Sequence, residues 1–153
     1  MIQALQILPE VLTSNTDNIN FSTIDVRTRS ATCGNRCGWL QYIPGGSEFT
    51  IIGGGRFKVS FNANVSSPVG QGALALKTGT GTDVEGTEMD FNTTTEGVYN
   101  NISFTKIIEV CPRVSTTIAV GSIPAIGGLT PTTATEIPTV KDANLIIEKI
   151  SDL

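Results

Sequence analysis

The side chains that most often carry out chemistry are scarce in this sequence of 153 residues, which contains no histidine. Without histidine, the Ser-His and Cys-His pairs of nucleophilic catalysis and most catalytic zinc sites are excluded. Two groups of residues remain that could hold a metal ion or move a proton, namely three cysteines and four neighbouring carboxylates. The composition alone therefore favours a protein that is not an enzyme.

The cysteines are Cys33, Cys37 and Cys111. Cys33 and Cys37 are spaced like half of a metal site, but a zinc ion takes four ligands, and only Cys111 and carboxylates could complete the set. We therefore predict no bound metal and no cofactor. An odd number of cysteines is unlike a secreted disulfide framework, so we expect reduced thiols in a protein made in a cytoplasm, with a Cys33–Cys37 disulfide as the alternative.

The four carboxylates are Asp83, Glu85, Glu88 and Asp90. Two of them could act as the acid–base pair of a glycoside hydrolase or lyase, or bind Ca²⁺. Strand alternation places Asp83 and Glu85 on one face, which is consistent with either role. The group lacks the spacing of a calcium loop, and exposed carboxylates are common, so a solvent-exposed strand face is favoured and the enzyme stays a remote alternative.

The charge balance argues against nucleic acid as a partner. Lys and Arg number 10 and Asp and Glu number 14, which gives a net charge of −4 and no basic face to neutralise phosphates. No run approaches the roughly 20 apolar residues that span a bilayer. The first residues also lack the basic start and the cleavage site of a signal peptide. We expect neither a membrane nor a nucleic acid partner.

Hydrophobic residues alternate with polar ones in several short segments. Phe57, Val59 and Phe61 face one way, while the residues between them are polar, which is typical of an antiparallel strand with one buried face. Residues 73–76 (ALAL) are apolar on both faces, as in a strand inside a sandwich. Short strands that recur about every ten residues predict an all-β sandwich or barrel. The expected core is Phe57, Val59, Phe61, Leu74, Leu76, Phe104, Ile118 and Val120.

The two ends of the chain have different patterns. Residues 1–18 are weakly apolar, without a clean period, and Pro9 interrupts them. We interpret them as an N-terminal arm that docks on another chain, with a leading strand or a frayed terminus as the alternative. Residues 19–153 are expected to form one domain. Within it, residues 121–139 are a long segment rich in Gly, Pro and Thr, and residues 144–150 are the last strand.

A series of motifs resembles a known family. The chain resembles the tumour-necrosis-factor/C1q-like jelly-roll module found in bacterial and bacteriophage structural proteins, over roughly residues 19–153. The resemblance implies an antiparallel jelly-roll sandwich whose last strand pairs beside the first, assembled as a homotrimer. The motifs that carry it, in order, are residues 20–27 (NFSTIDVR), 38–40 (GWL), 49–52 (FTII), 55–63 (GRFKVSFNA), 72–76 (GALAL), 101–110 (NISFTKIIEV) and 144–150 (NLIIEKI).

We therefore expect a bacteriophage virion protein, a trimeric capsid decoration or head-fibre module that binds and stabilises the capsid surface after synthesis in the host cytoplasm. The trimer interface is expected at Ile107, Ile146 and Tyr99, because these strands carry apolar side chains on more than one face. The alternative is the receptor- or glycan-binding tip of a phage fibre, with an exposed aromatic or Asn/Asp pocket on the outer loops, for which Tyr42, Tyr99 and residues 100–101 are the candidates. The residues expected to dock on the major capsid protein or another virion protein are Ile2, Leu5, Ile7, Leu8 and Leu12.

Overall fold

The computed structural model describes residues 1–12, 17–26, 36–43, 45–66, 70–79, 81–95, 97–123 and 138–152. Within these ranges the regular elements are all β-strands, and no helix is long and apolar enough to cross a membrane. The strands are β1 (Ile2–Leu5), β2 (Glu10–Val11), β3 (Thr23–Val26), β4 (Arg36–Cys37), β5 (Leu40–Tyr42), β6 (Phe49–Ile52), β7 (Gly55–Ser66), β8 (Gly70–Thr78), β9 (Thr82–Asp83), β10 (Met89–Thr93), β11 (Asn100–Val110), β12 (Ser115–Ile123) and β13 (Thr139–Ser151).

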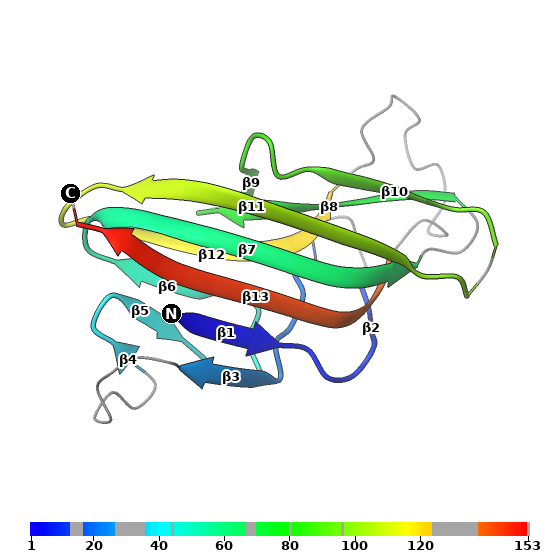
Figure 1. The fold of residues 1–153 in the computed structure, drawn as a ribbon, viewed down its shortest axis with the longest axis horizontal. Coiled ribbons are helices and arrows are strands. Elements are labelled where there is room, and N and C mark those ends of the chain that lie inside the picture. The colour runs from blue at the N-terminus through cyan, green and yellow to red at the C-terminus, as the bar shows by residue number, and fades with distance from the viewer. Residues whose placement is uncertain are drawn as a thin grey trace.

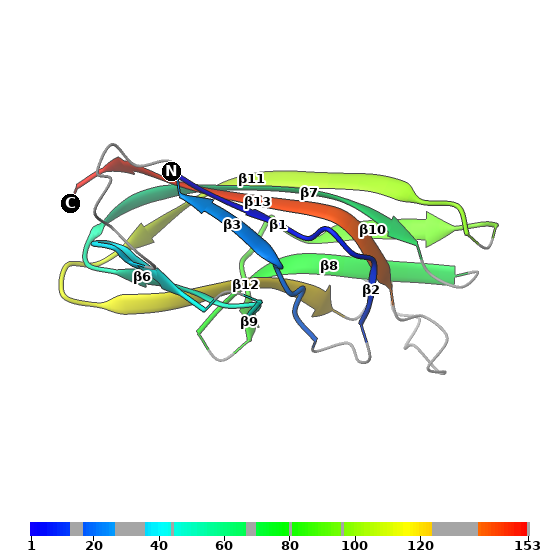
Figure 2. The same ribbon diagram turned by 90° about the horizontal axis from the view of Figure 1, so that it is seen from below.

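The strands form two sheets that stack face to face (Figure 1, Figure 2). Sheet A has the order β11-β7-β13-β1-β3, and β2 also pairs with β13. Sheet B has the order β10-β8-β12-β6-β5-β4, and β9 also pairs with β8. The pairings are antiparallel, as in the ladder between β7 and β11 and the ladder between β8 and β12. The predicted antiparallel sandwich is confirmed.

The alternating pattern of β7 fixes which of its faces enters the core. Phe57, Val59 and Phe61 are buried between the sheets, while Asn62 is exposed on the opposite face. The Phe61 ring stacks on the Phe104 ring of β11, with ring centroids 5.5 Å apart. Phe104 is only partly buried because β11 is the edge strand of sheet A, and the other expected core residues are buried as predicted.

Strand β8 is buried on both faces, as its sequence predicts. Leu74 and Leu76 belong to the main core between the sheets. Ala73 and Ala75 belong to a second, smaller cluster with Ile123 of β12. The side chains on both faces of β8 are buried, which explains why residues 73–76 are all apolar.

The N-terminal residues differ from the expected arm. Strand β1 lies inside sheet A, where Ile2 pairs with Ile147 of β13 on one side and with Val26 of β3 on the other. Ile2 and Leu12 are buried in the core. Residues 1–12 are thus part of the sandwich, and the strand beside the last one is β1 and not the segment 20–27. The pairing is non-local, so neither the weak periodicity nor Pro9 reveals it.

The C-terminal strand is longer than the sequence indicates. It begins at Thr139 and not at residue 144, and β12 continues to Ile123, into the segment expected to be irregular. A bulge between Lys141 and Asn144 interrupts its pairing with β7. This bulge breaks the alternation, which explains why the sequence pattern starts only after it. The remainder of the segment, residues 124–137, lies outside the described residues.

Candidate functional site

A pocket of about 340 Å³ opens on the side of sheet B that faces away from sheet A. It lies where β12 changes neighbours. Strand β6 pairs with β12 as far as Ile118. Further along β12, Asn18 forms an isolated β-bridge with Gly121. The amide N–H of Ile19 donates to the carbonyl oxygen of Val120 at 2.8 Å in the same contact. The pocket is therefore a consequence of the topology.

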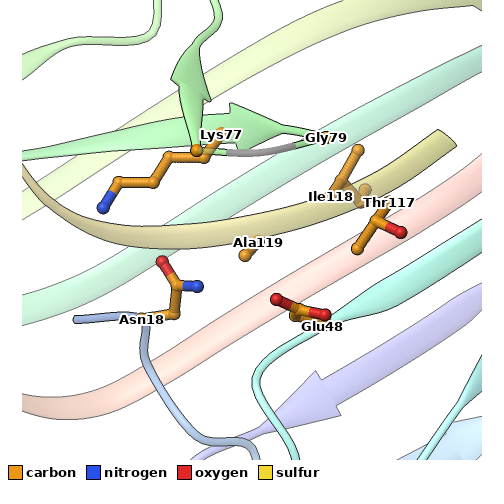
Figure 3. A pocket seen from close by; sticks show the side chains of 8 residues that line it. Asn18, Glu48, Lys77, Gly79, Thr117, Ile118 and Ala119 are labelled. Carbon is orange, nitrogen blue, oxygen red and sulfur yellow. The ribbon is translucent and has the colours of Figure 1, made fainter. Parts of the chain in front are cut away.

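Four side chains with polar groups line this pocket, from four separate parts of the chain (Figure 3). Asn18 precedes β3, Glu48 precedes β6, and Lys77 and Thr117 lie on the adjacent strands β8 and β12. The remaining lining residues are the side chain of Ile118 and the small residues Gly79, Gly81 and Ala119. The small residues leave the volume open between the polar groups.

Lys77 is an unusual feature of this wall, because its side chain is buried, with only 6% of its surface exposed. Its ammonium donates a hydrogen bond of 2.7 Å to the carbonyl oxygen of Ser122. Burial lowers the pKa of Lys77 below its ordinary value, and the charges of Asp83 and Asp17 act in the opposite direction. In Figure 3 the ammonium points away from Gly79 and Thr117, so mainly the methylene stem faces the pocket.

Asn18 and Glu48 are the polar groups with unused capacity. The amide oxygen of Asn18 is buried and accepts no hydrogen bond from the described residues. In Figure 3 this oxygen is turned toward Lys77, and the amide nitrogen is turned toward Ala119. Together with the hydroxyl of Thr117, these groups present both donors and acceptors to a small polar ligand. No motif in the sequence indicates this site, and the one signal of it is a lysine directly after the apolar run 73–76.

A second candidate surface is the outer face of sheet A, the side that faces away from sheet B. A shallow hollow of about 370 Å³ on it is lined by hydroxyl and amide side chains around Ile146. The charged residues toward one end are paired across the ladder, Arg56 with Glu109 at 3.2 Å and Lys58 with Glu148 at 3.5 Å. The residues that line the hollow are Ser60, Phe61, Asn62, Ser103, Phe104, Thr105, Asn144 and Ile146.

The structure brings the three residues predicted for a trimer interface to this sheet. Ile107, which is 57% exposed, pairs with Lys58, and Ile146 pairs with Ser60 two residues further along β7. Tyr99 lies just before β11, with its ring 5.6 Å from the ammonium of Lys141 on β13. The three residues thus share one sheet, and their role as an interface stays a prediction.

The residues predicted to dock on a capsid separate into two groups. Ile2 and Leu12 are buried in the core and present no surface to a partner, and Leu5 is half-buried. Ile7 and Leu8 are exposed, at 61% and 74%. The docking prediction therefore rests on Ile7 and Leu8 alone.

The candidate residues for a glycan pocket lie on two different sheets. Tyr42 lies on β5 of sheet B and is packed against the core, with its ring 6.4 Å from that of Phe49. Tyr99 and Asn101 belong to the β11 side of sheet A, and the Asn101 amide donates to Asn64 at 3.2 Å. Tyr42 therefore lies on the other sheet from residues 100–101, and a glycan site at Tyr99 and residues 100–101 stays a prediction.

The predicted carboxylate pair is also not formed by a common strand face. Strand β9 ends at Asp83, and Glu85 lies in the turn that follows, so the prediction that alternation aligns them was wrong. Glu88 accepts a hydrogen bond from the amide N–H of Gly86 at 2.8 Å. Among the residues that the structure describes, no group of three potential metal ligands lies together.

The cysteines are only partly covered by the structure. Cys111 is exposed and has a free thiol. Cys37 lies in β4, and Cys33 lies outside the described residues. The predicted choice between reduced thiols and a Cys33–Cys37 disulfide therefore stays a prediction.

The comparison with solved structures identifies the fold. The chain is similar to the globular domain of the zebrafish complement 1qA protein, with a TM-score of 0.62 and 11% sequence identity. The match covers 99% of this chain and 98% of that one. The fold is a C1q-like jelly roll. No profile of a known protein family matches the sequence, and no curated protein matches it either. At this level of identity the likeness concerns the fold, which the sequence motifs had indicated.

Proposed function

We propose that this protein is a non-enzymatic structural module of a bacteriophage virion, a homotrimeric capsid decoration or head-fibre protein. The observation that carries the proposal is the outer face of sheet A, where half-buried Ile146 lies among uncharged Ser, Thr and Asn side chains. Ile107, which is 57% exposed, lies on the same face beside Lys58. Apolar side chains among uncharged polar groups are typical of an interface between subunits, whose centre is depleted of charge.

The charges on this face support the same proposal. Arg56 and Lys58 already have carboxylate partners within their own subunit, so they need no partner from another chain. Burial of this end of the face in a trimer would therefore leave no charge without a counter-ion. A cyclic trimer needs a second, complementary patch on each subunit, at about 800 Å² per partner for a stable contact.

The trimer is tested by light scattering on the purified protein and on two matched variants. Ile146→Asp places a charge on the proposed interface and should give a monomer with an unchanged circular dichroism spectrum. Ile43→Asp changes an isoleucine that is 77% exposed and lies outside this face, and it should leave the trimer intact. A monomeric wild-type protein, or a trimer that tolerates Ile146→Asp, would contradict the proposal.

The attachment to the capsid is tested with heads of the encoding phage that lack the protein. Wild-type protein should sediment with such heads. Leu8→Ser should remain trimeric but lose this binding, because Leu8 is the most exposed of the predicted docking residues. Binding that survives both Ile7→Ser and Leu8→Ser would place the contact elsewhere on the module.

A further inference from the structure

We propose that the pocket between Asn18, Glu48, Lys77 and Thr117 binds one neutral sugar ring of a glycan. The proposal goes beyond the assembly role, since the pocket lies on sheet B and the proposed trimer face lies on sheet A. A virion protein with both features would hold to the capsid through one part of its surface and to a glycan through another.

The volume and the shape of the pocket fit a single ring. At about 340 Å³ it lies near the lower end of the range of roughly 300–1,000 Å³ found for small-molecule sites. Ala119 and the methylene stem of Lys77 provide an apolar wall for the C–H groups of a sugar. Glu48, Asn18 and Thr117 provide the polar groups around it.

The polar groups match the chemistry of hydroxyls, which both donate and accept hydrogen bonds. The Glu48 carboxylate only accepts, whereas the Asn18 amide nitrogen, turned toward Ala119 and the pocket in Figure 3, only donates. The Thr117 hydroxyl does both and lies 3.4 Å from the hydroxyl of Thr50. An acceptor and a donor that line the same pocket suit the hydroxyls of one ring. A primary ammonium suits this set less well, because the N–H groups of Asn18 would face it.

The charge of the pocket selects against anionic ligands. Glu48 is exposed and has no hydrogen bond or ion pair with the described residues, so no cation among them offsets its negative charge. The Lys77 ammonium is bound to the carbonyl of Ser122 and is balanced by Asp83 and Asp17. A phosphate, a sulfate or a uronic acid would therefore meet an uncompensated carboxylate without a free cation, whereas a neutral sugar would not.

The test is a titration of the ¹⁵N-labelled full chain with the methyl glycosides of glucose, galactose, mannose and N-acetylglucosamine, followed by NMR. We expect at least one of these neutral sugars to shift the backbone amides of Glu48, Lys77, Gly79 and Ala119. Glucuronate and butylamine, as anionic and ammonium probes, should leave them unchanged. Light scattering on the same samples is not needed, because binding is expected whether or not the chain is a trimer.

Two variants connect binding to this pocket. Ala119→Leu fills the space and should abolish the shifts. Glu48→Gln keeps the size of the side chain and should weaken binding about tenfold, the effect of one hydrogen bond to a charged group. Glu85→Gln, which changes an exposed carboxylate in a turn, is the control and should bind like the wild type. Circular dichroism melting shows whether each variant is folded. If Ala119→Leu does not fold, the binding of Glu48→Gln is the test of the pocket.

Three results would overturn the proposal. The first is the absence of shifts with every glycoside of the panel at concentrations that saturate weak sugar sites. The second is binding that Glu48→Gln leaves unchanged, which would place the sugar elsewhere. The third is stronger binding of glucuronate or butylamine than of any neutral glycoside, which would assign another ligand class to the pocket.

Discussion

Gly121 and Asn18 lie so close that a side chain on Gly121 has no room. A Cβ atom built on Gly121 would be 2.4 Å from the amide oxygen of Asn18 and 2.3 Å from the backbone oxygen of Asp17. The contact fixes residues 17–19 along β12 where β6 has ended, and it thereby closes one side of the candidate pocket.

This contact predicts that Gly121→Ala destabilises the fold by about 1–3 kcal/mol, because the opposing atom of Asp17 is backbone and can yield only if the segment moves. Gly38→Ala is the matched control, since a Cβ atom there meets nothing within 4 Å and the backbone has no positive φ. Chemical denaturation of both variants measures the difference. Equal stability of the two variants would mean that residues 17–19 do not pack against β12 in solution.

The position of β1 inside sheet A predicts opposite results for two isoleucines of the same segment. Ile2 is fully buried, so Ile2→Ala should cost about 2–5 kcal/mol of unfolding free energy. Ile7 is 61% exposed, so Ile7→Ala should change it by about 0.5 kcal/mol or less. Denaturation curves of the two variants distinguish a strand of the sandwich from a free arm, for which neither substitution would matter.

The stacked pair of Phe61 and Phe104 predicts a large single-site effect and a measurable coupling. Phe61→Ala should cost about 3–5 kcal/mol, since its side chain is 2% exposed, and Phe104→Ala should cost less, since Phe104 is only partly buried. The double variant should reveal a coupling of about 0.5–1.5 kcal/mol between the two rings. Strictly additive effects would show that the rings do not stack in solution.

The buried Lys77 predicts a specific dependence of stability on pH. Because burial lowers its pKa in the folded state, the folded protein loses this proton at a lower pH than the unfolded chain does. Between these two pKa values the unfolded state binds more protons, so the contribution of Lys77 to stability becomes more favourable as the pH rises. Below the lower pKa the cost of the buried charge is fully present.

Lys77→Met keeps the unbranched stem and removes the charge, so it isolates this contribution. The unfolding free energy of the wild type minus that of Lys77→Met should increase from neutral pH toward the ordinary pKa of lysine. Urea denaturation at several alkaline pH values measures it. A difference that stays flat or decreases would contradict the burial of the ammonium.

The sequence determined the fold class and most of the strands between residues 49 and 123. In β7 the alternation of Phe57, Val59 and Phe61 with polar residues sets the buried face, because successive side chains of a strand point to opposite sides. In β8 the run 73–76 shows that both faces are covered. These are local patterns, and a strand of nine or more residues carries enough of them to be identified.

The tertiary structure alone decided the role of the N-terminus and the site on sheet B. Strand β1 has four residues, too few for a period, and its place depends on pairing with Ile147, far away in the chain. The pocket likewise needs Asn18, Glu48 and Lys77, which come together only because β12 exchanges β6 for residues 17–19 along its edge. Contacts of this kind depend on which distant segments of the chain pair with each other, and a local pattern of side chains does not indicate that pairing.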